Sequence, residues 1–167
     1  LADLVPVDAA MTWDHLCVLV GTEVRCRGDE ANLAIGASPL ATQPAGGHPV
    51  RYADETIVSA NAIFAGPGHF CAILEGDGGV ACWGAGGALI GSPTTALGAA
   101  HRVVAPVGEE GFLSDVRGLA LNSTSTCAIV GAKGEVYCWG YSHSYGINTE
   151  GVPSYAPKKI MISEEDV

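Results

Sequence analysis

The sequence predicts an all-β protein built from three repeated units, and three observations support this prediction. Short apolar runs alternate with turn-forming residues, and 23 of the 167 residues are glycine, a composition typical of strands joined by tight turns. No stretch has the period of an amphipathic helix. All six cysteines fall in three similar stretches, HLCVLVGTEVRCRG (15–28), HFCAILEGDGGVACWG (69–84) and STCAIVGAKGEVYCWG (125–140).

The spacing of the cysteines defines the length of the unit. The second cysteine of each pair, at Cys26, Cys82 and Cys138, recurs every 56 residues. Three units of about this length account for the chain as a single array, with approximate bounds 1–56, 57–112 and 113–167. Strand-rich repeats of this size are typical of solenoids, arrays or propeller blades.

Each cysteine pair is expected to lie in a β-hairpin. If Cys71 opposes Cys82, residues 75–78 form a four-residue loop, and the third copy can be interpreted in the same way. The first copy is two residues shorter, which leaves Gly21-Thr22 as a turn suited to type II′. Because side chains alternate between the faces of a strand, an even-numbered deletion keeps the cysteines on one face. This conserved parity is the strongest support for the hairpin.

The hairpin places the two cysteines of each pair within bonding reach. Directly opposed residues of antiparallel strands have Cα atoms about 4.5–5.5 Å apart, a separation that a disulfide can span. We therefore predict the disulfides Cys17–Cys26, Cys71–Cys82 and Cys127–Cys138. Such bridges indicate a secreted, periplasmic or cell-surface protein, and a start at Leu1 fits the removal of a signal peptide or an upstream domain. The alternative is three pairs of reduced, buried cysteines in a cytosolic protein.

The repeated stretches resemble those of the regulator of chromosome condensation family. Its repeats have a small-Gly step, His-Thr-x-Ala-Leu, a glycine turn, Val-Tyr-x-Trp-Gly and a Gly-x-Leu-Gly ending. Ala65-Gly66 matches the step and ALIG (88–91) approximates the ending, whereas Leu121-Asn122 and SYGIN (144–148) depart from the pattern. The cysteine positions are similar to those of bacterial extracellular members. The resemblance implies a β-propeller of four-stranded blades, usually seven.

Three blades cannot close such a ring, so the expected fold is an incomplete or partner-completed propeller. Both faces of the hairpins are apolar, as in a blade stacked between neighbours. The first copy differs because Arg25 and Arg27 stand where the second copy has Ala81 and Trp83. We expect this blade to end the array or to meet a partner through a polar face. The alternative is that the arginines lie at a solvated rim.

Charge and motif content disfavour several classes of function. The formal net charge of −10 argues against binding nucleic acid or an anionic membrane surface. No apolar run reaches the roughly 20 residues of a membrane-spanning helix. His15 and His69 each lie two residues before a cysteine, but disulfide formation would use the sulfurs, so neither a metal site nor a cofactor is expected. No nucleophile motif identifies a catalytic residue.

The favoured function is a non-enzymatic extracellular module that binds a protein partner or further blades, supplied by self-association or by another chain. Loops on a rigid scaffold commonly form binding sites, and arginine and tyrosine are enriched at protein interfaces. The candidate partner-binding residues are Arg25, Arg27, Arg51, Tyr52, Tyr141, Tyr145 and Tyr155. For the tyrosines the alternative is ordinary loop packing. Two other functions stay open: a hydrolase-like enzyme with its site at the propeller mouth, and a purely structural component of a surface assembly.

Overall fold

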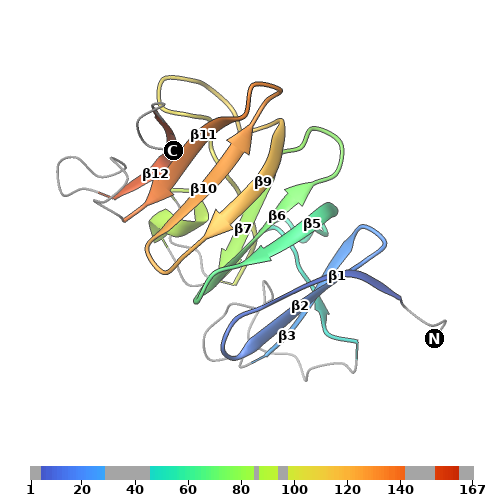
Figure 1. The fold of residues 1–167 in the computed structure, drawn as a ribbon. Helices are drawn as coiled ribbons and strands as arrows, with labels where there is room; N and C mark the ends of the chain where they lie inside the picture. Colours follow the sequence, from blue (N-terminus) through green and yellow to red (C-terminus); the bar gives the residue numbers. More distant parts are fainter. Residues whose placement is uncertain (1–4, 29–45, 85–86, 94–97, 142–152, 162–167) are drawn as a thin grey trace.

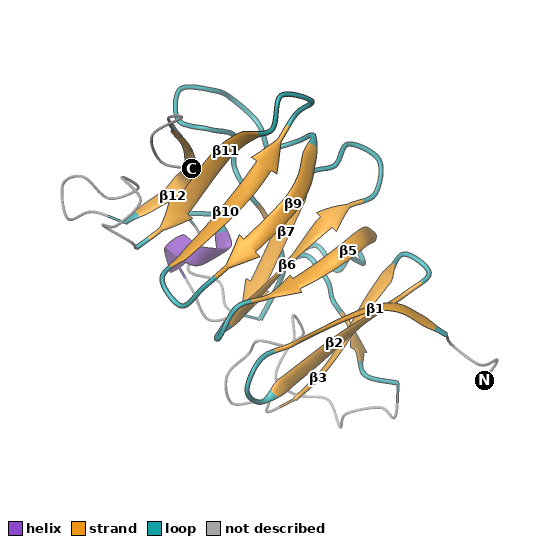
Figure 2. Ribbon diagram, in the orientation of Figure 1, coloured by secondary structure: helices purple, strands orange, loops and turns teal. Residues whose placement is uncertain are grey.

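The computed structural model describes residues 5–28, 46–84, 87–93, 98–141 and 153–161. Within them, twelve strands form three four-stranded antiparallel sheets, which follow one another along the chain (Figure 1). A short 3₁₀ helix, η2 (Gly87–Ile90), lies beside the third sheet (Figure 2). No helix in this described part of the chain combines the length and the apolar character of a membrane span. The prediction of an all-β fold of propeller-type blades is confirmed.

Each sheet is a meander, because neighbouring strands in the sheet are also neighbours in the chain. The first sheet contains β1 (Pro6–Met11), β2 (His15–Val20), β3 (Glu23–Gly28) and β4 (His48–Pro49). The second contains β5 (Ala60–Ala65), β6 (His69–Leu74), β7 (Val80–Gly84) and β8 (His101–Arg102). The third contains β9 (Val116–Leu121), β10 (Ser125–Val130), β11 (Glu135–Gly140) and β12 (Ser154–Ile160). This four-stranded meander is the architecture of a propeller blade.

The middle hairpin of each sheet has the register that the parity of the repeat predicts. The cysteines of each pair are directly opposed and are joined by disulfides, with Cα–Cα distances of 4.0, 4.0 and 4.1 Å in chain order. In the first hairpin Val20 pairs with Glu23 around the two-residue turn. Gly21 has a φ of 62° there, whereas Thr22 has no positive φ, as a type II′ turn requires.

The glycine that follows each tryptophan of the repeat has a structural reason. Gly84 and Gly140 have φ angles of 111° and 123°, which residues with a side chain rarely adopt. A Cβ atom on Gly140 would also lie 2.5 Å from the carbonyl oxygen of Thr124. The Trp-Gly step therefore ends the strand in a way that only glycine permits.

The three sheets stack in a fixed direction. We call the side of a sheet that bears its disulfide the cysteine face and the other side the opposite face. The cysteine face of the first sheet packs against the opposite face of the second, which carries Phe70 and Trp83. The cysteine face of the second sheet packs in the same way against Ala128 and Trp139 of the third. The molecule thus has two separate hydrophobic cores, each lying between consecutive sheets.

Candidate functional site

The cysteine face of the third sheet has no sheet packed on it in the described structure. Ile129 on this face is 47% exposed, whereas the residues at the same position of the second and first hairpins, Ile73 and Leu19, are 8% and 1% exposed. Cys127 is likewise half-buried, whereas Cys17 and Cys71 are buried. The third sheet therefore presents to solvent the kind of apolar face that the other two sheets bury.

The opposite face of the first sheet is open as well. Leu16 is exposed, although Phe70 and Thr126 at the same position of the other hairpins are fully buried. Arg27, across the strand pair from Leu16, is exposed where the other sheets have buried tryptophans. Met11 on β1 adds a further exposed apolar side chain. Among the residues that the structure describes, nothing covers either end of the array, so both ends are open.

Arg25 is engaged within its own sheet. Its Nη1 donates to Glu23 Oε1 at 2.5 Å, and its Nε and Nη2 donate to the carbonyl oxygens of Gly46 and Gly47, both at 2.8 Å. These contacts attach the segment before β4 to β3. The side chain is half-buried, so Arg25 has a clear structural role in addition to any contact with a partner.

Arg51 and Tyr52 belong to a tightly held turn after β4. Tyr52 N donates to Thr56 O at 2.9 Å, and Asp54 Oδ1 accepts from Thr56 N at 3.1 Å and from its hydroxyl at 2.6 Å. Arg51 Nη1 donates to the carbonyl oxygen of Glu55 at 2.6 Å, and Glu55 has a φ of 67°. Strained backbone of this kind is often associated with function.

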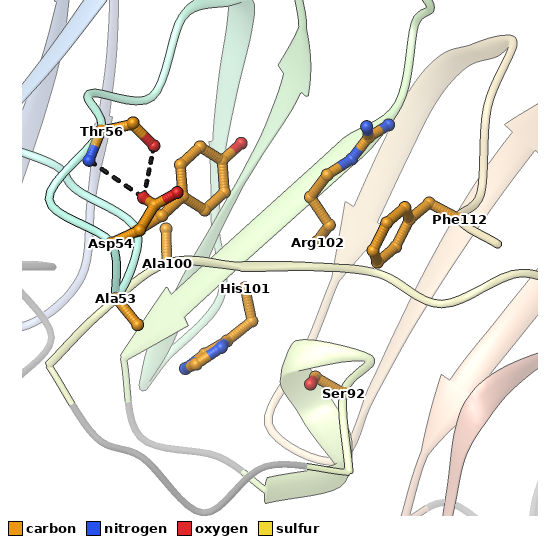
Figure 3. Close-up of a pocket in the computed structure, with 9 residues that line it drawn as sticks. Ala53, Asp54, Thr56, Ser92, Ala100, His101, Arg102 and Phe112 are labelled. Atoms are coloured by element: carbon orange, nitrogen blue, oxygen red, sulfur yellow. Dashed lines mark hydrogen bonds between the residues drawn. The ribbon is translucent and has the colours of Figure 1, made fainter.

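This turn forms one wall of a groove of about 540 Å³, shown in Figure 3. We call it the aromatic groove; it is lined by Tyr52, Ala53, Asp54, Thr56, Ser92, Ala100, His101, Arg102 and Phe112. Arg102 Nη2 donates to Asp77 Oδ2 at 2.5 Å, a hydrogen bond that lowers the pKa of Asp77. The guanidinium carbon of Arg102 lies 4.8 Å from the centroid of the Phe112 ring. Burial raises the pKa of Tyr52, so its phenol is a neutral hydrogen-bond donor at neutral pH.

The remaining predicted partner-binding tyrosines lie elsewhere. Tyr141 follows β11, and its phenol oxygen accepts from Ala88 N at 3.3 Å, whereas Tyr155 is exposed on β12. Tyr145 lies outside the described residues. The predicted residues therefore do not form one site: Arg25 and Arg27 belong to the open face of the first sheet, and Arg51 and Tyr52 to the turn beside the aromatic groove.

Sequence reasoning missed several exposed groups. Arg102 and Phe112 lie outside the repeated stretches, so the repeat gave no reason to single them out. Trp13 could have been found, because the other copies have Pro67 and Ser123 at the corresponding place before the hairpin. Trp13 is 85% exposed, and a large exposed aromatic side chain is common at protein interfaces.

His69 joins two sheets. Its side chain is fully buried, and its Nε2 lies 2.8 Å from Thr126 Oγ1 of the third sheet. Burial lowers its pKa to about 4, so the ring is neutral at neutral pH. Among the described residues, no group of three or more His, Cys, Asp or Glu side chains is placed to hold a metal ion.

The fold is that of the RCC1-type propellers, as comparison with solved structures shows. Human WBSCR16 aligns with a TM-score of 0.67 at 20% identity, over 98% of this chain and 41% of that chain. Prp20p of Saccharomyces cerevisiae, the yeast RCC1, aligns with a TM-score of 0.67 at 17% identity, over 95% and 39% of the two chains. The ectodomain of the Physcomitrella patens receptor kinase CR4 aligns with a TM-score of 0.50 at 23% identity, over 84% and 31%.

This chain shares its fold with proteins that are longer than it is. This chain spans about two fifths or less of the length of these proteins. No protein-family model matches the sequence. No curated protein matches it. Prp20 is described in complex with Kap60 and as binding Gsp1p and histones.

Proposed function

We propose that this chain is a non-enzymatic, extracellular protein-binding module that assembles with further blades through its open sheet faces. Each unit, 1–56, 57–112 and 113–167, acts as one blade. The observation that carries the proposal is the exposure of Ile129, at a position that is buried in both preceding hairpins. Apolar surface of this kind is stabilised by removal from water.

The chemistry of the missing neighbour follows from the interfaces already present. The cysteine faces of the first and second sheets each receive an apolar opposite face that carries a tryptophan. We therefore expect the third sheet to receive a blade with an apolar opposite face, supplied by a second copy or by another chain. The Prp20 complexes support a protein-binding role for a fold of this type.

The extracellular part of the proposal rests on the cysteines. The three disulfides leave no described cysteine free, and disulfides persist in oxidising compartments. This supports secretion, the periplasm or the cell surface as the location.

The native mass of the purified chain tests the assembly. We expect multiples of 17.0 kDa for the wild type, and a shift to the monomer for Ile129→Asp, because a buried carboxylate destabilises an apolar interface. Val107→Asp is the matched control, since Val107 is also exposed but lies in the loop between β8 and β9. A monomeric wild type would contradict self-association. An unchanged mass for Ile129→Asp would exclude this face as the interface.

A further inference from the structure

The aromatic groove has two aromatic side chains in its lining, from segments far apart in the sequence. Tyr52 comes from the turn after β4 and Phe112 from the loop between β8 and β9. Phe112 is 52% exposed, yet its ring is held in place by the Arg102 guanidinium at 4.8 Å. Figure 3 shows the Phe112 ring beside the Arg102 side chain. The groove therefore offers apolar surface that is fixed before any ligand arrives.

The polar groups of the groove include both donors and acceptors. The Tyr52 phenol is a donor, because burial raises its pKa and keeps it protonated at neutral pH. Asp54 is an acceptor, and the hydrogen bonds from Thr56 lower the pKa of its carboxyl, which keeps it ionised at neutral pH. A ligand that satisfies this lining must both donate and accept hydrogen bonds.

The lining of the groove has no excess of cationic groups. The cation of Arg102 is paired with Asp77, and Asp54 adds one carboxylate to the lining. A phosphate or sulfate site needs an excess of cationic groups, which this lining lacks. A second cation at the Phe112 ring would be repelled by the Arg102 guanidinium, which already lies 4.8 Å from the ring centroid. Both features favour a neutral ligand.

We propose that the aromatic groove binds a neutral saccharide. A pyranose ring has an apolar C–H face that packs on an aromatic side chain, and hydroxyl groups that each donate and accept. The volume of about 540 Å³ lies within the range of small-molecule sites, about 300–1,000 Å³. A proline-rich segment also docks on aromatic surfaces, but it presents few donors to the Asp54 carboxylate.

An array of immobilised neutral, sialylated and sulfated glycans tests the proposal on the intact chain. Neutral glycans should bind, and the strongest of them is then titrated against ¹⁵N-labelled protein by NMR. Phe112→Ala should weaken binding at least about tenfold. Asp54→Asn should weaken it about threefold or more, because the ionised acceptor is lost while Asn Oδ1 still accepts from Thr56. Tyr155→Ala, which removes an exposed aromatic side chain on β12, should leave binding unchanged.

Several results would overturn the proposal. One is the absence of binding to any neutral glycan; another is binding confined to sialylated or sulfated glycans. Unchanged affinity in a folded Phe112→Ala variant would place the saccharide elsewhere. Decaproline is tested in the same titration, and binding that Phe112→Ala abolishes, without any glycan binding, would assign the groove to proline-rich segments. The native mass of Phe112→Ala should equal that of the wild type, so failure here is distinct from failure of the assembly.

Discussion

His69 shows how one residue makes the contact between two sheets depend on pH. The folded chain holds the imidazole neutral, with a pKa lowered by burial from 6.5 to about 4. The unfolded chain takes up a proton near pH 6.5. Between these values the unfolded state binds more protons than the folded state. The contribution of His69 to the free energy of unfolding is therefore complete above pH 6.5 and decreases as the pH falls toward 4.

Replacement of His69 by glutamine should remove most of this pH dependence. Glutamine is neutral at every pH and keeps a polar group that can reach Thr126. Between pH 7.5 and 5 we expect the wild type to lose about 2 kcal/mol more than His69→Gln. Urea unfolding at both pH values, with the disulfides intact, measures the difference. Equal losses in the two proteins would show that His69 is not the group responsible.

At the scale of the element, the three hairpins share one covalent design but differ in environment. The first two disulfides lie in the cores between sheets. Cys127 of the third lies on the open face and is half-buried. A thiolate must reach a sulfur atom to reduce a disulfide, so access decides which hairpin is attacked first.

In the unassembled chain, such as the monomer expected for Ile129→Asp, the Cys127–Cys138 disulfide should therefore be reduced first by a thiol reductant under native conditions. Timed quenching with an alkylating reagent, followed by peptide mass spectrometry, gives the rate for each pair. In denaturant, where all three hairpins are solvated, the rates should become similar. Earlier reduction of Cys17–Cys26 would mean that the first sheet opens faster than a thiolate attacks the disulfide of the third sheet.

At the scale of the whole molecule, stability is divided between two cores. One core lies between the first and second sheets and the other between the second and third. In repeat proteins of this kind each unit is stabilised chiefly by its nearest neighbours. A defect in one core should therefore loosen one end of the array and leave the other end folded.

Leu19→Ala and Leu113→Ala form a matched pair for this expectation. Leu19 lies in the first core and Leu113 in the second, with 1% and 2% of their surfaces exposed. Each truncation should cost about 2–5 kcal/mol. Hydrogen exchange should increase in β1–β3 for Leu19→Ala and in β9–β11 for Leu113→Ala. An equal increase in all three sheets for both variants would show a single cooperative unit.

The structure of the hairpins could be predicted from the sequence better than the arrangement of the connections between strands. The hairpin register was predictable, because a deletion of two residues in the first copy kept Cys17 and Cys26 on one face. The order of stacking was not predictable, because both faces of the second hairpin are apolar and either face could meet the next sheet. The aromatic groove was also missed, since the packing of separate connections brings Tyr52, Arg102 and Phe112 to one place.

The fixed direction of stacking has a consequence for how such proteins evolve. Each boundary joins a cysteine face to an opposite face, so the two sides of a blade are complementary to each other. A tandem duplication of one unit of about 56 residues would therefore create a new boundary of a type that already exists. Chain length can change by whole units without the invention of a new surface, whereas an inverted unit would place like faces together.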